Sequence, residues 1–468
     1  MSVNKKRFIT ALISACMMFS AFLPACAGGA WKAEDFVVPA YDESLQIDIM
    51  PWWAPVGAVQ NQVEDPKYWK LAADAGYNVV HAIHLDMRQH ASKVGTYLGN
   101  AKAAGLKIII KDGDWVNADD HGSNLSLPSN DKNAKFYEND DAFYGIFIND
   151  EGEKKHWNDI KDKFELSKER FPGKTHFANT CRFTRDDNQW YQDVSDYITT
   201  VKPSLFSYDW YAMMADGTTR PDFISTMATA RYAVQDAGGG IPAWNTLLTT
   251  GSNTSSFANY RKQSYEDILW QSMTTMAYGY HGLAHYMYGV EEQNGKPNET
   301  FDRMINDKGE PTELYFRVQR ANLGIRKWDH VYKSFEWKGT VCIEGKTANP
   351  EKLIRMILPQ FRNRDKLSDM DGVTALTASQ DVLAGIFKDA EGRGGCMISS
   401  AVSPALNLDT AVELALDKKK YQAVAVYDNE MTEGEPQILP LSGKGVLKFT
   451  LAPGAGKFLI PLTKNNNK

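Results

Sequence analysis

Short apolar runs alternate with longer stretches of helical pattern between residues 46 and 289. Successive runs begin 28 to 42 residues apart, the spacing of a repeated strand–helix unit in which the helix crosses over to a parallel strand. Eight such units favour a closed (β/α)₈ barrel, an α/β fold, over an open sheet. The predicted strands are Gln46–Trp53, Asn78–His84, Leu106–Lys111, Phe143–Asn149, Thr175–Asn179, Leu205–Tyr211, Ile241–Asn245 and Leu283–Gly289.

Helix-capping signals between the runs support this interpretation. Asp65 followed by Pro66 predicts a helix start, and Gly76 predicts the end of that segment before the second strand. Ser264 and Asp267 have the spacing of a capping box at the start of the helix before the eighth strand. We therefore expect the barrel to occupy residues 40–327.

A different pattern begins near Trp328, where short apolar runs alternate with Gly, Asp and Asn turns. The segment Lys388–Gly392 lies between two such runs and predicts a hairpin turn. Residues 328–462 are therefore predicted to form an antiparallel β-sandwich, followed by a disordered polar tail at 463–468. The runs are Ser334–Cys342, Val382–Phe387, Gly395–Ala401, Tyr421–Tyr427 and Gly445–Leu451.

The N-terminus has the features of a secretory signal peptide over residues 1–26. Lys5, Lys6 and Arg7 precede an apolar run that is too short and too polar to span a bilayer. The segment Leu23–Cys26 resembles a bacterial lipobox, in which Cys26 would carry the lipid. We expect an exported lipoprotein of the periplasm or cell surface, with cleavage after Ala27 and free secretion as the alternative. The only membrane contact expected is the lipid on Cys26.

Composition excludes several classes of function. The net charge is −6, whereas a protein that binds nucleic acid needs a basic surface. Without Cys16 and Cys26, three scattered cysteines remain, which is no disulfide framework. No zinc-ligand spacing and no Gly-rich phosphate loop occur, so we expect no metal and no cofactor. We expect the protein to act as a monomer.

Barrel enzymes carry their reacting groups where the strands end, so those positions are the informative ones. Here they are carboxylates, amides and aromatic rings, and aromatic rings can stack on the apolar face of a sugar. Glycosidic bond cleavage needs one carboxylic acid and one carboxylate. The strand-end residues that we expect to contact a sugar are Trp52, Trp53, His84, Asp112, Asp114, Trp115, Asp150, Asn179, Trp210, Tyr211, Trp244, Asn245, His285, Tyr286, Tyr288 and Glu291.

One strand end carries a more specific motif. The segment Tyr144–Glu151 resembles the fourth strand of clan A-like glycoside hydrolases, which ends in a Glu that acts as general acid/base. Phe206–Tyr211 and Leu283–Gly289 resemble the sixth and eighth strands of the same barrels. The resemblance covers most of the chain that follows the predicted signal peptide, and it implies that Glu151 is the acid/base.

The seventh strand departs from that pattern. Clan A enzymes carry their nucleophilic Glu at its end, whereas here the strand ends in Trp244 and Asn245 without a carboxylate. We expect Asp209 to supply the second carboxylate, with Glu291 or Glu292 as alternatives. A carbohydrate-binding protein without catalysis and a different barrel hydrolase, such as a deacylase or a metal-dependent enzyme, remain rival interpretations.

Overall fold

The computed structural model describes residues 31–59, 62–115, 132–238, 240–252, 259–289, 292–293, 296–297, 301–432 and 434–464. The predicted signal peptide with Cys26 and the candidate Glu291 lie outside these residues. Glu292 belongs to a short strand, β9, but its side chain is not described. Among the described residues, no helix is both long and apolar enough to cross a membrane.

Eight parallel strands form the barrel, as predicted, and each overlaps one of the eight apolar runs. The sheet order β1-β8-β7-β6-β5-β4-β3-β2 closes on itself, because Trp52 after β1 forms a parallel bridge with His81 of β2. The strands are β1 (Asp48–Pro51), β2 (Val79–His81), β3 (Lys107–Ile110), β4 (Phe143–Asp150), β5 (Thr175–Cys181), β6 (Phe206–Asp209), β7 (Ala243–Leu248) and β8 (Gly282–Tyr286).

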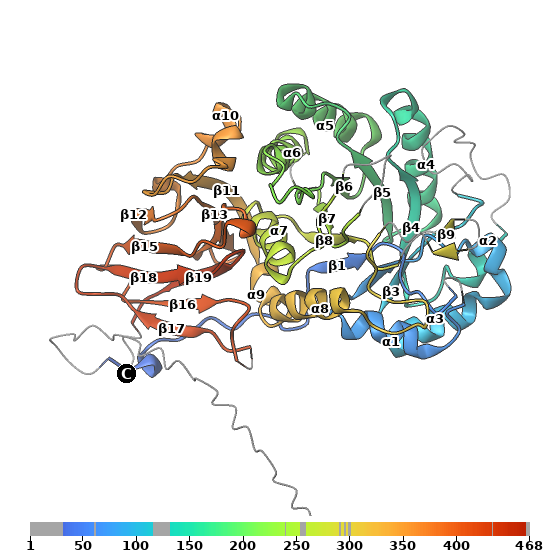
Figure 1. Ribbon diagram of the computed structural model, residues 1–468, viewed down its shortest axis with the longest axis horizontal. Coiled ribbons are helices and arrows are strands. Elements are labelled where there is room, and N and C mark those ends of the chain that lie inside the picture. Colours follow the sequence, from blue (N-terminus) through green and yellow to red (C-terminus); the bar gives the residue numbers. More distant parts are fainter. Residues whose placement is uncertain are drawn as a thin grey trace, which may run out of the picture.

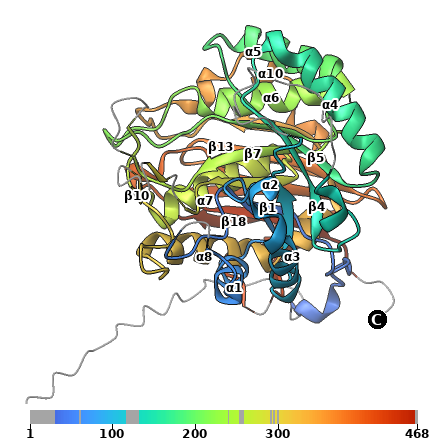
Figure 2. The same ribbon diagram turned by 90° about the vertical axis from the view of Figure 1, so that its right-hand side faces the viewer.

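Helices surround the barrel on the outside, with α4, α5 and α6 on one side and α1, α3 and α8 on the other (Figure 2). Asp65 caps the first of them with Pro66 at its first position, and Ser264 and Asp267 form the predicted capping box of another. The helices are α1 (Pro66–Asp74), α2 (Met87–His90), α3 (Val94–Ala103), α4 (Trp157–Arg170), α5 (Asp187–Val201), α6 (Phe223–Gly238), α7 (Tyr265–Ala277), α8 (Glu313–Arg326), α9 (Asp329–Lys333) and α10 (Pro359–Arg362).

The C-terminal part is a sandwich of two antiparallel sheets beside the barrel (Figure 1). The predicted hairpin turn at Lys388–Gly392 connects two of its strands. One sheet has the order β11-β13-β14-β19-β16-β17 and the other β12-β15-β18. The strands are β11 (Phe335–Ile343), β12 (Val373–Ala378), β13 (Val382–Asp389), β14 (Gly394–Ser400), β15 (Thr410–Leu416), β16 (Ala423–Tyr427), β17 (Gln437–Pro440), β18 (Val446–Leu451) and β19 (Gly456–Leu462). Two further short strands, β9 (Glu292–Gln293) and β10 (Lys296–Pro297), pair with each other after β8.

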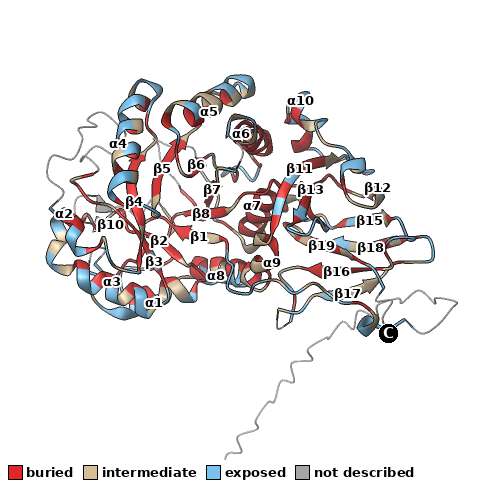
Figure 3. Ribbon diagram, turned by 180° about the vertical axis from the view of Figure 1, so that it is seen from behind, coloured by how far each residue is buried: buried red, intermediate tan, exposed pale blue. Residues whose placement is uncertain are grey.

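Helix α7 joins the two parts, because it lies between the barrel strands and the larger sheet of the sandwich (Figure 1). Every residue of α7 from Asp267 to Ala277 is buried, as its red colour in Figure 3 shows. A helix that is buried all round needs apolar or internally satisfied side chains on every face. Ser272 and Thr274 meet this need by donating to carbonyl groups of the same helix, those of Ile268 at 2.9 Å and Trp270 at 2.7 Å. The sandwich is therefore packed on the barrel through one continuous core.

Candidate active site

A cavity of about 440 Å³ lies where the barrel strands end. Parallel barrel strands all end on the same face, so residues far apart in the sequence meet there. Nine of the residues that the sequence singled out line this cavity: Trp52, Trp53, Asp150, Glu151, Asn179, Asp209, Trp210, Tyr211 and Tyr286. The two candidate catalytic carboxyl groups are therefore brought together.

Glu151 stands directly after β4, at a sharp turn of the chain. Its φ of 49° lies in the left-handed region, which residues other than glycine seldom occupy. Its backbone N–H donates to the carbonyl of Asn179 at 2.8 Å, so the neighbouring strand β5 fixes the turn. Gly145 inside β4 permits this close pairing, because a Cβ there would lie 1.9 Å from the carbonyl oxygen of Thr175. The glycine of the strand-four motif thus has a structural role.

Asp209 ends β6 and is only 9% exposed. Burial raises the pKa of its carboxyl group from the ordinary 3.8 to about 8, and the nearby charge of Glu151 raises it as well. The hydrogen bond from Asn179 and the charge of Arg220 oppose these effects without cancelling them. Asp209 and Glu151 therefore interact electrostatically inside one cavity.

Asn179 holds this arrangement from β5. Its side-chain nitrogen donates to Asp209 at 2.9 Å and to Asp150 at 3.2 Å. Its side-chain oxygen accepts from the hydroxyl of Ser207 at 2.8 Å and from that of Thr246 at 3.4 Å. Because both ends of the amide are occupied, the side chain has one orientation, which presents its nitrogen to the carboxyl groups.

Aromatic rings form much of the remaining wall. Tyr211 stacks on Tyr286 with ring centroids 5.5 Å apart, and Tyr260 meets Tyr211 edge-on at 5.7 Å. Trp53 stacks on His84 at 5.9 Å. The indole nitrogen of Trp52 is buried without a hydrogen-bond partner among the described residues. Such a wall offers apolar ring faces together with polar edges, as a sugar requires.

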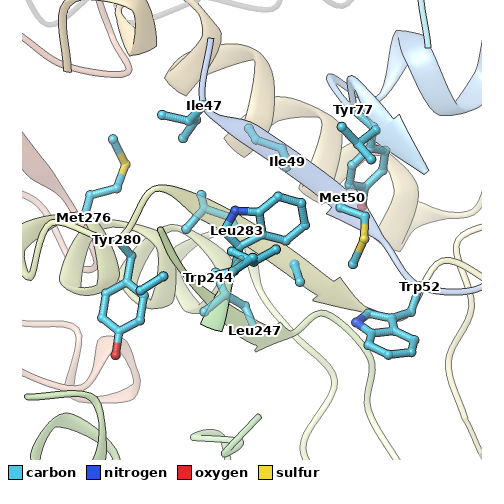
Figure 4. Close-up of a cluster of buried hydrophobic side chains, with 14 of the residues drawn as sticks. Ile47, Ile49, Met50, Trp52, Tyr77, Trp244, Leu247, Met276, Tyr280 and Leu283 are labelled. Carbon is cyan, nitrogen blue, oxygen red and sulfur yellow. The ribbon is translucent and has the colours of Figure 1, made fainter. Parts of the chain in front are cut away.

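Four candidates on or just after strands β7 and β8 do not reach the cavity. Trp244 is 2% exposed and lies among apolar side chains of the barrel core (Figure 4), while Asn245 donates to Thr275 of α7 at 2.9 Å. His285 lies 3.1 Å from the hydroxyl of Tyr77, and Tyr288 is fully buried. None of the four lines the cavity. Asn245 and His285 point to the other face of the sheet, since side chains alternate along a strand, whereas Trp244 points inward and packs on Phe177 below the cavity.

The candidates that follow strand β3 also lie outside the cavity. Asp112 is fully buried and accepts hydrogen bonds from Tyr137 at 3.0 Å and Asn133 at 3.1 Å. Asp114 lies 3.4 Å from the same Asn133, and Trp115 is packed in the core. These side chains hold their own loop together.

His84, the candidate after β2, also lies outside the cavity, with its Nε2 2.8 Å from the carbonyl of Pro55. Burial lowers the pKa of its imidazole to about 3. His84 is therefore a neutral ring that stacks on Trp53 and does not line the cavity itself.

Sequence reasoning did not single out eight further lining residues: Ile83, Cys181, Arg182, Arg220, Thr246, Leu248, Tyr260 and Phe301. Thr246 occupies the place on β7 where a second carboxylate was sought. Tyr260, Arg220 and Phe301 come from long connections after the strands, and no periodic pattern marks such residues. Within the described residues, no group of three or more His, Cys, Asp or Glu side chains could hold a metal ion.

Comparisons with known proteins give only distant structural similarities, since no family model and no curated protein sequence matches the chain. A family 39 glycoside hydrolase from Bacteroides cellulosilyticus WH2 has a TM-score of 0.48 and 12% identity, with 91% of this chain and 83% of that one covered. A monomeric β-xylosidase from Caulobacter crescentus CB15 has a TM-score of 0.45 and 12% identity, with coverages of 92% and 98%. A GH30 endoxylanase from Clostridium papyrosolvens C71 has a TM-score of 0.43 and 10% identity, with coverages of 90% and 97%. Such distant similarity carries no argument about activity, which must come from the residues of this chain.

Proposed function

We propose that this protein is a glycoside hydrolase and that Glu151 and Asp209 form its catalytic pair. The observation that carries the proposal is the presence of these two carboxyl groups in one cavity walled by aromatic rings, where the charge of Glu151 also raises the pKa of Asp209. Cleavage of a glycosidic bond requires a proton donor on one side and a carboxylate on the other, beside a transition state resembling an oxocarbenium ion.

Burial and the nearby charge of Glu151 raise the pKa of Asp209, which favours the protonated form of its carboxyl group at neutral pH and assigns it the role of the acid. Asp209 then protonates the leaving glycosidic oxygen. Glu151 attacks the anomeric carbon or activates the water that does so. The sequence motif favoured the opposite assignment, with Glu151 as the acid, and the deeper burial of Asp209 is the reason for the reversal.

The expected export of the protein agrees with this activity. A signal peptide and a lipid on Cys26 would place the barrel in the periplasm or at the cell surface, where it would meet oligo- or polysaccharides. The stacked pair of Tyr211 and Tyr286 would hold a sugar ring in the cavity.

Hydrolysis assays test the proposal directly. Wild-type protein is incubated with 4-nitrophenyl glycosides and polysaccharides, and released product is compared with that of Glu151→Gln and Asp209→Asn. Each substitution removes one member of the pair and should lower activity by at least about 100-fold. Glu153→Gln is the matched control, because Glu153 is exposed and pairs with Lys155 at 2.7 Å outside the cavity.

A second candidate function is carbohydrate binding without hydrolysis. Thr246 favours it, because the strand that supplies the nucleophile in clan A enzymes offers a hydroxyl group at the cavity here. This alternative predicts saturable glycan binding and no product from any substrate. It also predicts that Asp209→Asn binds glycan as strongly as the wild type does at each pH between 5 and 9.

A further inference from the structure

We propose that the cavity binds an anionic sugar unit and that Arg220 recognises its carboxylate or sulfate group. The inference rests on the proposed function, because it names the class of substrate for the same site. It begins from the charges that line the cavity, where the carboxyl groups of Asp150, Glu151 and Asp209 are joined by two arginines, Arg182 and Arg220.

The two arginines differ in how their charges are balanced. Arg182 is fully buried and pairs with Asp187 at 2.8 Å and with Asp222 at 3.5 Å. Its charge is therefore neutralised within the protein, and it supports the wall of the cavity. Arg220 makes no ion pair with any carboxylate in the part of the chain that the structure describes. Arg220 lies in the same cavity as acidic groups but forms no close pair with them, so the carboxylate or sulfate group of a ligand could pair with its guanidinium directly.

The guanidinium of Arg220 is nevertheless held in place. It lies over the ring of Trp210, 4.2 Å from the centroid, and donates to the hydroxyl of Tyr260 at 3.3 Å. The indole nitrogen of Trp210 in turn donates to Asp222 at 3.0 Å, which fixes the ring beneath the arginine. The backbone N–H of Arg220 donates to the carbonyl of Ala212 at 2.7 Å, which anchors the loop. Arg220 would therefore lose little side-chain conformational entropy when a ligand binds.

Donor groups of Arg220 remain for a ligand. The buried Nε has no hydrogen-bond partner among the described residues, and only one terminal nitrogen donates to Tyr260. A guanidinium fork matches two oxygens of one carboxylate or sulfate. Uronic acids and sulfated sugars carry such groups on a ring that can stack on Tyr211 and Tyr286. The ring would lie between the arginine and the carboxyl pair.

Binding of simple sugars tests the inference without relying on hydrolysis. D-glucuronate, D-galacturonate and glucose 6-sulfate are titrated into the wild-type protein, with D-glucose and D-galactose as neutral counterparts, and binding is followed by tryptophan fluorescence and calorimetry. We expect anionic sugars to bind about 10- to 100-fold more tightly than their neutral counterparts. Preference for the uronates identifies a carboxylate as the group bound, and preference for the sulfate identifies a sulfate ester.

Variants assign the preference to Arg220. In Arg220→Gln the ratio of anionic to neutral affinity should fall to about one, and Arg220→Lys should give an intermediate ratio because the charge remains without the fork. Arg355→Gln is the matched control, because it removes the same charge from an exposed arginine that pairs with Glu344 in the C-terminal part. Equal binding of anionic and neutral sugars by the wild type, absence of binding by every anionic sugar, or a preference that survives in Arg220→Gln would overturn the inference.

The experiments distinguish failure of the hydrolase proposal from failure of the proposed anionic subsite. Hydrolysis of neutral glycans with no effect of Arg220→Gln on substrate preference would remove the anionic subsite and leave the hydrolase. Arg220-dependent binding of anionic sugars without hydrolysis of any glycan would leave the subsite and remove the hydrolase.

Discussion

Asn179 donates a hydrogen bond of 2.9 Å from its side-chain nitrogen to a carboxyl oxygen of Asp209. The carbonyl oxygen of the same residue accepts the backbone N–H of Glu151 at 2.8 Å. One residue of β5 therefore contacts both the carboxyl group of Asp209 and the backbone of Glu151. The backbone of Glu151 and the carboxyl group of Asp209 are thus both anchored to the barrel sheet.

Removing the hydrogen bond from the Asn179 side chain to Asp209 should shift the pH dependence of hydrolysis. In Asn179→Ala the ionised form of Asp209 loses a hydrogen bond, so the pKa of Asp209 rises further. Activity declines at high pH when the acid loses its proton. We expect the pH at which this decline occurs to rise by about one unit. The profile of kcat/KM against pH measures it. The control is Asn188→Ala, at an exposed position on α5. If the high-pH decline of Asn179→Ala stayed at the wild-type pH, Asn179 would not stabilise the ionised form of Asp209.

Asp209 should make the folded protein less stable as the pH rises. Its pKa is about 8 in the folded state against an ordinary 3.8, so between these values the folded state holds a proton that the unfolded chain has lost. Stability from this group is therefore lost progressively from about pH 4 to pH 8. Asp209→Asn cannot titrate, so its stability relative to wild type should rise over this window by a few kcal/mol. Denaturant unfolding at several pH values measures the difference, and parallel curves would contradict the raised pKa.

Gly145 should be essential for the strand pairing that places Glu151. A Cβ at this position would lie 1.9 Å from the backbone oxygen of Thr175, and backbone atoms inside a barrel cannot easily move. Gly145→Ala should therefore lower the free energy of unfolding by about 3 kcal/mol. The control is Gly95→Ala in α3, where no atom lies within 4 Å and alanine should stabilise the helix by up to about 1 kcal/mol. Equal stabilities of the two variants would show that the pairing is looser than described.

The ring of Tyr286 should contribute to substrate affinity. Tyr286→Ala removes one member of the stacked pair with Tyr211, so KM should rise about tenfold, whereas Tyr286→Phe keeps the ring and should change KM much less. Steady-state kinetics on the substrate found in the hydrolysis screen measures both variants. Phe183→Ala, which removes an aromatic ring that is 51% exposed and outside the cavity, is the control. A similar effect of all three substitutions would argue against stacking on Tyr286.

The barrel could be predicted because each buried strand is a short apolar run bounded by helix caps and glycines. The exact strand ends could not, and they decide which side chains reach the cavity. Strand β7 continues to Leu248, three residues beyond the predicted end, so Thr246 and Leu248 reach the cavity, whereas Trp244 lies in the barrel core and Asn245 bonds to helix α7. Arg220 could not be predicted for another reason. It lies in a loop, and its side chain is positioned by contacts with Trp210 and Tyr260 that no sequence pattern marks.

The fate of solvent oxygen tests the hydrolase proposal most directly. A glycan selected by the hydrolysis screen is digested in water enriched in ¹⁸O, and the products are analysed by mass spectrometry. Hydrolysis by the Glu151 and Asp209 pair predicts one ¹⁸O atom at each new reducing end formed by the wild type. It predicts almost no cleavage by Glu151→Gln or Asp209→Asn. Cleavage by either variant at the wild-type rate, or intact glycan after saturable binding to the wild type, would contradict it.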